Sequence, residues 1–112
     1  MIELKDIFRR DFDPAETHRQ MINFGGAAML MSWGMHAKSI IQDKGRSVGY
    51  KFMVQGHHFK GWVFITLDWD DTYIVTLVNP RTKKIKDQFE GVYFDVLADT
   101  IDKAVEYIDE YK

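Results

Sequence analysis

Three carboxylates fall within four residues at Asp68-Trp69-Asp70-Asp71, and two histidines are adjacent at His57-His58. Carboxylates this close in sequence can hold Mg²⁺ or act as an acid and base pair. With a neutral imidazole they could also bind Zn²⁺ or Mn²⁺. One hypothesis is therefore a small metal-dependent hydrolase that uses His36 or His58 together with Asp68 or Asp71.

The same residues have an ordinary structural interpretation, which we favour. Asp70-Asp71 is typical of a turn, because aspartate tolerates turn geometry and bonds its own backbone. His57 and His58 fall in a predicted turn over residues 56–61, where adjacent side chains point apart, and His18 is predicted to be half-exposed on a helix. The chain has no cysteine and lacks a Walker loop, a dinucleotide fingerprint and a G-x-S-x-G motif. The sequence predicts no catalytic residues, no metal site and no cofactor.

Charge is unevenly distributed along a chain whose formal net charge is −2. Residues 38–86 carry nine Lys or Arg against four Asp, which leaves +5, whereas residues 87–112 carry two Lys against eight acids, which leaves −6. A basic sheet with aromatic residues is typical of proteins that bind single-stranded nucleic acid, and this is the alternative function. Its interface would comprise Lys38, Lys51, Lys60, Arg81, Lys83, Lys84 and Lys86.

Aromatic and methionine residues favour protein binding instead. Between Met29 and Tyr73 they exceed what one face of a small sheet can bury under a single helix. Methionine and tryptophan are common at adaptable interfaces, so either a sheet face binds a partner or the N-terminal helices cover that face. The predicted partner-binding residues are Trp33, His36, His57, His58, Lys60 and Trp62. The partner is a host protein or a second copy, so the chain is a monomer or a homodimer.

Capping chemistry and periodicity predict the elements that position these residues. A capping box is predicted at Asp13-Pro14-Ala15-Glu16, with proline at the first helical position. It predicts a helix over residues 14–24, which ends at Gly25-Gly26 because glycine adopts the left-handed conformation at low cost. Helical spacing upstream predicts a short helix within an N-terminal extension, residues 1–13. The apolar residues with this spacing are Leu4, Ile7, Phe8 and Phe12.

A period of two predicts strands over residues 50–55, 61–69, 73–78 and 85–89, joined by turns into an antiparallel β-meander of four to five strands. Residues 28–41 also alternate as in a strand, with a bulge or bend at Gly34. Residues 94–111 return to helical spacing, with Asp99, Asp102 and Glu106 on the polar side, which predicts an amphipathic helix packed on the sheet. The predicted fold class is α+β, with residues 1–112 forming a single domain.

Composition places the chain among small globular proteins. No run approaches the roughly 20 apolar residues of a membrane helix, and the charged start has no apolar segment of a signal peptide behind it. The absence of cysteine fits a reducing compartment. We expect a soluble, cytoplasmic protein that does not bind membranes.

Four strings resemble, in order, small uncharacterised proteins of phages and conjugative or mobile elements of gut bacteria. They are Phe24-Gly25-Gly26, residues 34–38 (Gly-Met-His-Ala-Lys), residues 65–73 (Ile-Thr-Leu-Asp-Trp-Asp-Asp-Thr-Tyr) and residues 90–97 (Glu-Gly-Val-Tyr-Phe-Asp-Val-Leu). The resemblance spans roughly residues 22–97 and assigns no functional residue. It implies a non-enzymatic protein that binds a host protein, with inhibition of a host defence system as one form of that function.

Overall fold

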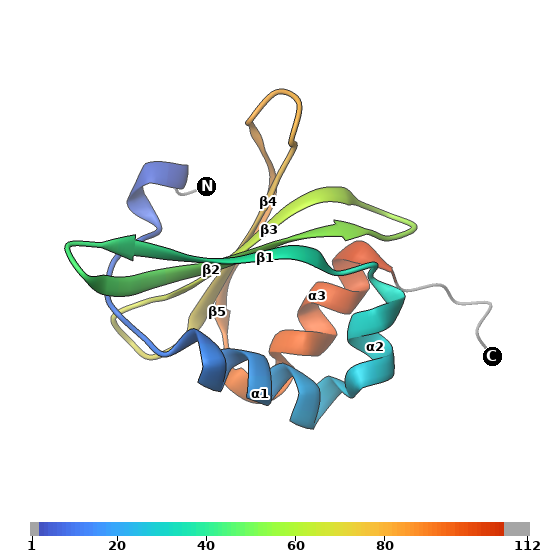
Figure 1. Cartoon of the computed structure of the whole chain (residues 1–112), viewed down its shortest axis with the longest axis horizontal. Helices are drawn as coiled ribbons and strands as arrows, with labels where there is room; N and C mark the ends of the chain where they lie inside the picture. The colour runs from blue at the N-terminus through green and yellow to red at the C-terminus, as the bar shows by residue number, and fades with distance from the viewer. Residues whose placement is uncertain (1–2, 107–112) are drawn as a thin grey trace.

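The structure of the chain is a computed structural model that describes residues 3–106 (Figure 1). Five strands form one antiparallel sheet in the order β1-β2-β3-β4-β5, preceded and followed by helices, so the predicted α+β class and meander are confirmed. The elements are η1 (Leu4–Asp6), α1 (Pro14–Gly25), α2 (Ala27–Ser32), β1 (His36–Asp43), β2 (Arg46–Gln55), β3 (Lys60–Leu67), β4 (Tyr73–Val78), β5 (Ile85–Val92), η2 (Phe94–Val96) and α3 (Leu97–Val105).

Helix α1 begins and ends where its capping residues predict. The Asp13 carboxylate accepts a hydrogen bond from the Ala15 N–H at 3.0 Å, and Gly26 leaves the helix with a φ of +89°, which a glycine adopts without strain. The reciprocal half of the predicted capping box does not form, because the Glu16 carboxylate pairs with Arg19 instead.

The strand pattern predicted across residues 28–41 is wrong in its first part. Residues 27–32 form helix α2, and the strand begins only at His36, after the predicted bend at Gly34, whose φ is +63°. Spacing of three residues lets Leu30 and Trp33 both reach the core, whereas Met31 between them is 79% exposed. The burial of residues three apart therefore favours a helix here, in spite of the alternating pattern in the sequence.

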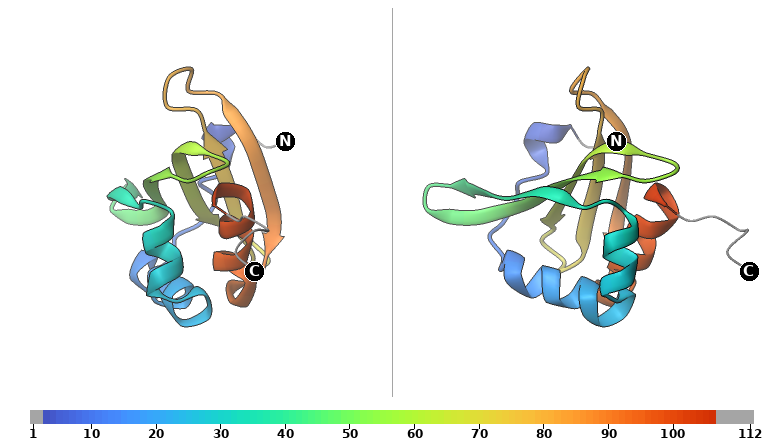
Figure 2. Two further views of the ribbon diagram at one scale, coloured as in Figure 1. Left: turned by 90° about the vertical axis from the view of Figure 1, so that its right-hand side faces the viewer. Right: turned by 45° about the vertical axis from the view of Figure 1, so that its right-hand side comes forward.

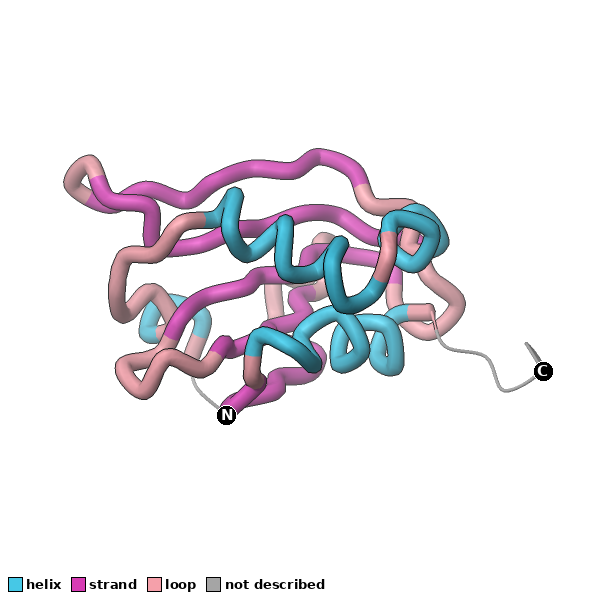
Figure 3. Tube along the Cα trace, turned by 90° about the horizontal axis from the view of Figure 1, so that it is seen from below, coloured by secondary structure: helices cyan, strands magenta, loops and turns pink. Residues whose placement is uncertain are grey.

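All three α-helices lie on one side of the sheet, which we call the helix face (Figure 2). The main core fills the space between them and includes the fully buried Trp33, Phe52, Ile65 and Leu97. Three helices rather than one bury the excess of large side chains on this face. Viewed from the helix side, β1 is the outermost strand and α1 crosses in front of the sheet (Figure 3).

The opposite side of the sheet, which we call the second face, is covered in part by the N-terminal segment (Figure 1). Ile7 is fully buried there against Phe64, Ile74 and Val78. The helix predicted through Phe12 is reduced to the three-residue η1, because the Phe12 N–H bonds instead to the Ser47 carbonyl at 3.0 Å. Leu4, Ile7 and Phe8 thus belong to a second, smaller core, whereas Phe12 packs against the main core.

Leu97, Ile101 and Val105 of the predicted apolar stripe are buried, whereas Phe94 lies before α3 in η2 and is 49% exposed. Part of the acidic side of α3 is buried as well. Asp102 and Glu106, predicted to be on the solvated side, are only 8% and 7% exposed. The Trp33 indole N–H donates to Asp102 Oδ1 at 3.0 Å, and the His57 backbone N–H donates to Glu106 Oε2 at 2.8 Å. Helix α2 and the β2–β3 turn therefore cover a second side of α3.

The last part of the predicted C-terminal helix, residues 107–111, lies outside the described residues. Within residues 3–106, no helix combines the length and apolar character needed to cross a membrane.

Candidate functional site

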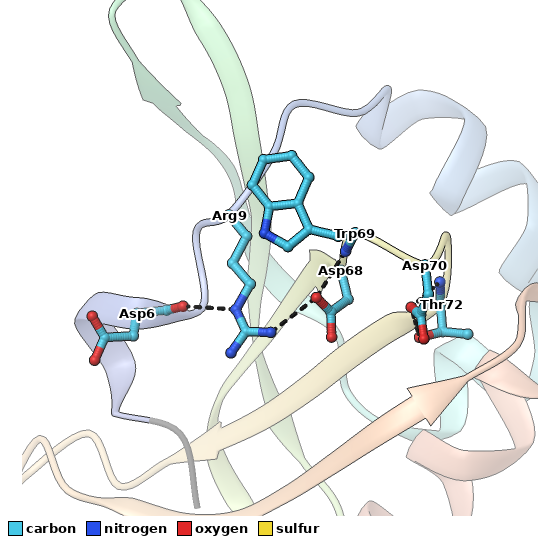
Figure 4. Close-up of polar contacts among 6 residues, drawn as sticks. All are labelled: Asp6, Arg9, Asp68, Trp69, Asp70 and Thr72. Carbon is cyan, nitrogen blue, oxygen red and sulfur yellow. Dashed lines mark hydrogen bonds and ion pairs between the residues drawn. The ribbon is translucent and has the colours of Figure 1, made fainter.

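The loop of residues 68–71, where the hydrolase hypothesis placed its carboxylates, is held by the N-terminal segment (Figure 4). Arg9 donates from Nη1 to Asp68 Oδ1 at 2.9 Å and from Nε to the Asp6 carbonyl at 3.2 Å. Arg10 donates to Asp71 Oδ1 at 2.6 Å. Two carboxylates that could ligate a metal are thus engaged in ion pairs that fix the N-terminal segment to the sheet.

Asp70 completes the turn. Its Oδ1 accepts from the Thr72 hydroxyl at 2.6 Å and from the Thr72 N–H at 3.1 Å. These hydrogen bonds lower the pKa of Asp70. Among residues 3–106, no three His, Cys, Asp or Glu side chains are grouped so that they could hold a metal ion. The loop carries the turn chemistry that we favoured from its sequence.

The predicted partner-binding residues do not form one surface. Trp33 is 0% exposed, so its assignment to a binding surface is wrong: its indole is needed in the core, against Phe52 and Asp102. His36 and Trp62 lie on either side of Met53 in one cross-strand row. Trp62 is half-buried on the second face, with the Lys51 Nζ 4.6 Å from its ring centroid.

His57, His58 and Lys60 lie in or beside the β2–β3 turn. Their side chains are exposed as predicted, but the turn is docked on the end of α3. The His57 Nδ1 lies 2.8 Å from Glu106 Oε1, and the His58 N–H donates to the Val105 carbonyl at 2.8 Å. The turn therefore helps to hold α3 against the sheet.

The basic residues of the nucleic-acid alternative lie on several elements. Lys51 lies over Trp62 on the second face, whereas Lys86 lies 5.6 Å from the ring of Phe59, which belongs to the core on the helix face. Arg81, Lys83 and Lys84 lie in the β4–β5 turn, and Lys38 and Lys60 lie on β1 and at the start of β3. Single-stranded nucleic acid requires a continuous basic groove, and among these residues Lys60 and Lys86 line one cavity together with Asn79.

The structure does bring together a different set of residues, at the β1 edge of the sheet. Within residues 3–106, β1 pairs only with β2, and no element lies on its outer side (Figure 3). Ile40 in its middle is 51% exposed, and residues 39–42 carry no charge. The other edge strand, β5, carries Lys86, Asp87 and Glu90, the kind of charges that protect an edge from pairing.

Two adjoining cavities lie beside β1 on the helix face and meet at His18. One, of about 360 Å³, lies between α1, α2 and the start of β1. The other, of about 330 Å³, lies between the start of α1 and the middle of β1. We call the two together the edge groove and define it by His18, Ile22, Met31, Lys38, Ile40 and Tyr50.

Two other surfaces are weaker candidates. A cavity of about 500 Å³ lies between β5 and α3, but Lys103 in it is already paired with Asp99 at 3.1 Å. The exposed rings of Phe24 and Phe94 contact each other edge to face, with 5.6 Å between the ring centroids. Val96, two residues after Phe94, is also exposed. These rings form an exposed apolar patch. The edge groove joins apolar walls, the cation of Lys38 and a strand edge that is uncovered within residues 3–106 and uncharged in its middle.

His18 and Tyr50 form the polar contact at the centre of the groove. The His18 Nδ1 lies 3.0 Å from the Tyr50 hydroxyl. Burial raises the pKa of Tyr50 to about 12, so the hydroxyl keeps its proton and can donate to a neutral imidazole. Burial, and then the charge of Lys38, lower the pKa of His18. The neutral imidazole leaves Lys38 as a cation of the groove.

Replacing His18 by glutamine is expected to weaken the loss of stability on acidification. The unfolded chain takes up a proton at the ordinary pKa of histidine, about 6.5, whereas the folded chain resists protonation until lower pH. The contribution of His18 to the free energy of unfolding is therefore complete above about pH 6.5 and declines as the pH falls below this value. Urea unfolding of wild type and H18Q at about pH 7.5 and about pH 5.5 measures the difference. The exposed-histidine variant H36Q is the control, and an equal decline in wild type and H18Q would contradict the assignment.

Sequence inspection did not identify the edge groove. His18 was predicted as an ordinary half-exposed helix residue, which its position confirms, but Ile22, Met31 and Ile40 were not grouped with it. One signal was available: a strand whose middle, Ser39-Ile40-Ile41-Gln42, is uncharged on both sides. That signal becomes informative only once this strand is known to lie at an edge.

No protein-family model, no curated protein and no solved structure matches the chain. Evidence for function therefore comes from the geometry of the edge groove itself.

Proposed function

We propose that this chain is a non-enzymatic interaction module that binds a partner protein at the edge groove and the outer edge of β1. The observation that carries the proposal is the coincidence of an apolar groove with a strand edge beside it that is uncovered within residues 3–106 and uncharged over residues 39–42. Natural sheets usually block such edges with charges, bulges or covering elements. In β1 the irregularities at His36/Ser39 and Ile41/Gln42 leave a short regular stretch, residues 39–41, that carries no charge and has no covering element within residues 3–106. Met31 and Ile40, on opposite sides of the groove, expose apolar surface of the kind that marks interaction sites.

The partner we propose to test first is a host protein. The resemblance to proteins of phages and mobile elements motivates this choice, and components of host defence systems belong among the candidates. A binding role also agrees with the carboxylates of residues 68–71, which are engaged by Arg9, Arg10 and Thr72. The proposal requires no cofactor and no metal.

Selection from a display library of bacterial protein fragments tests the proposal. Fragments enriched on the full chain are expected to bind Ile40→Glu about tenfold more weakly or worse, because a charge then enters the apolar groove. The matched control is Val96→Glu, which places the same charge at an exposed apolar residue of η2, outside the edge groove. Binding to V96E should stay within about twofold of wild type.

Two outcomes would contradict the proposal. In the first, no enriched fragment binds wild type more tightly than I40E, which would show that the edge groove is not a binding site. In the second, the fragments bind V96E more weakly than wild type but bind I40E as tightly as wild type. The interface would then lie at the aromatic patch around Phe24 and Phe94. Far-UV circular dichroism and thermal unfolding of both variants establish that each remains folded.

A further inference from the structure

We infer that the partner contributes an extended, acidic and apolar segment that adds to the outer edge of β1 as a further strand and places alternate side chains in the two cavities of the edge groove. This inference rests on the proposed function and specifies the chemistry of the ligand. It follows from the unpaired backbone of β1, the spacing of the two cavities and the charge around them.

The backbone of β1 supplies the first part of the recognition. In an antiparallel pair, every second residue directs its N–H and C=O toward one neighbour and the intervening residues direct theirs away. Pairing of β1 with β2 is regular over residues 39–41, between irregularities at His36/Ser39 and Ile41/Gln42. Outward groups in this stretch have no strand partner within residues 3–106. A short extended segment can therefore form main-chain hydrogen bonds there.

The spacing of the cavities fits a strand. Lys38 lines one cavity and Ile40 lines the other, so the side chains of both residues lie on the helix face, although Lys38 belongs to the irregularity between His36 and Ser39. A segment paired with β1 presents its own side chains to that side with the same period. Residues i and i+2 of the segment would thus face the two cavities.

Charge selects the kind of segment. No aspartate or glutamate lines either cavity, and Arg19, which lines one of them, is paired with Glu16. Lys38 has no ion-pair partner within the described part of the chain, and its charge is felt at His18. A segment with Asp or Glu beside its apolar residues complements this field.

A second copy of the chain fits less well than an acidic segment. Edge-to-edge pairing of two β1 strands would bring together two basic edges, each with Lys38, Lys44 and Arg46 against Asp43. Like charges at such short distance oppose association. Self-association is therefore an outcome that the test must be able to detect.

Selection of short randomised peptides on the full chain, followed by a charge exchange, tests the inference. Enriched peptides are expected to alternate apolar residues and to prefer Asp or Glu over Lys or Arg. Lys38→Glu should weaken their binding about three- to tenfold, and replacing the acidic residue of the peptide by lysine should restore it on this variant. Lys84→Glu, at an exposed lysine in the β4–β5 turn, is the matched control and should leave affinity unchanged.

N-methylation of the peptide backbone supplies an independent readout. Methyl groups at alternate amides should abolish binding, because those amides pair with β1, and methyl groups at the intervening amides should be tolerated. Some peptides could bind wild type more tightly than I40E and still show helical spacing, a preference for basic residues or no alternation in the effect of N-methylation. Any of these three results would overturn the inference but leave the proposed function standing. Concentration-dependent dimerisation that I40E abolishes would overturn it in favour of a second copy. Failure to obtain any groove-dependent ligand would overturn the proposed function itself.

Discussion

Replacing Trp33 by alanine is expected to lower the free energy of unfolding by about 3–5 kcal/mol, the usual cost of truncating a buried tryptophan. The Trp33 side chain is fully buried and stacks on Phe52, with 6.4 Å between ring centroids. Its indole N–H donates to Asp102. The variant would lose this packing and would also leave a buried carboxylate without its donor, which adds a desolvation cost.

Urea unfolding followed by far-UV circular dichroism measures this effect. Trp33→Phe should fall between wild type and W33A, because it keeps a ring against Phe52 but loses the hydrogen bond to Asp102. Trp69→Ala is the matched control: Trp69 is 69% exposed, so its truncation should cost no more than about 0.5 kcal/mol. A cost for W33A equal to that of W69A would show that Trp33 is not a core residue.

Replacing Gly56 by alanine is expected to cost about 1–3 kcal/mol, as overpacking of a tight contact does. A Cβ atom on Gly56 would lie 2.2 Å from the Val105 carbonyl oxygen and 2.5 Å from Val105 Cγ1. The same carbonyl accepts the His58 N–H, so moving the end of α3 away would break that bond. Gly56 is thus the position at which the β2–β3 turn closes on α3.

Gly45→Ala separates this close contact from backbone strain. Gly45 has a φ of +81°, and a Cβ atom there would meet no atom within 4 Å. Its replacement should cost about 1 kcal/mol through the left-handed conformation alone. Thermal and urea unfolding compare the two variants, and a G56A cost no larger than that of G45A would mean that α3 yields to the added methyl group.

Elements set by local chemistry were predictable from sequence. Helix α1 follows from the cap at Asp13, the proline after it and the glycine pair at its end. Strands β2, β3 and β4 follow from alternation and from turn residues between them. Helix α2 was not predictable in this way, since Met29, Met31, Trp33 and Met35 alternate as in a strand. Only the burial of Leu30 and Trp33 against the other elements decides for a helix.

The candidate site depended on information that short-range patterns do not carry. The edge groove combines His18 from α1, Met31 from α2 and Ile40 from β1, and it exists because β1 lies at an edge with two helices beside it. Order within a sheet is a property of the whole chain. The burial of Asp102 was missed for the same reason: its donor, Trp33, belongs to a segment that was read as part of the strand pattern.

The proposed mode of binding makes β1 an inner strand of the complex. Its outward N–H groups, which face solvent in the free chain, would then be hydrogen-bonded to the ligand and protected from exchange with solvent. Lys51 and Trp62 on the second face, and the patch around Phe24 and Phe94, would keep their surroundings. The two states therefore differ in a pattern that amide exchange can resolve residue by residue.

Amide hydrogen exchange of the full chain, free and saturated with a selected peptide, tests the central claim most directly. We expect the outward-facing amides within residues 39–41, where the pairing of β1 is regular, to slow by about tenfold or more, while the amides around Lys51, Trp62 and Phe94 keep their rates. Unchanged exchange along β1, with protection appearing on the second face or around Phe94, would contradict the claim that this strand edge is the binding site.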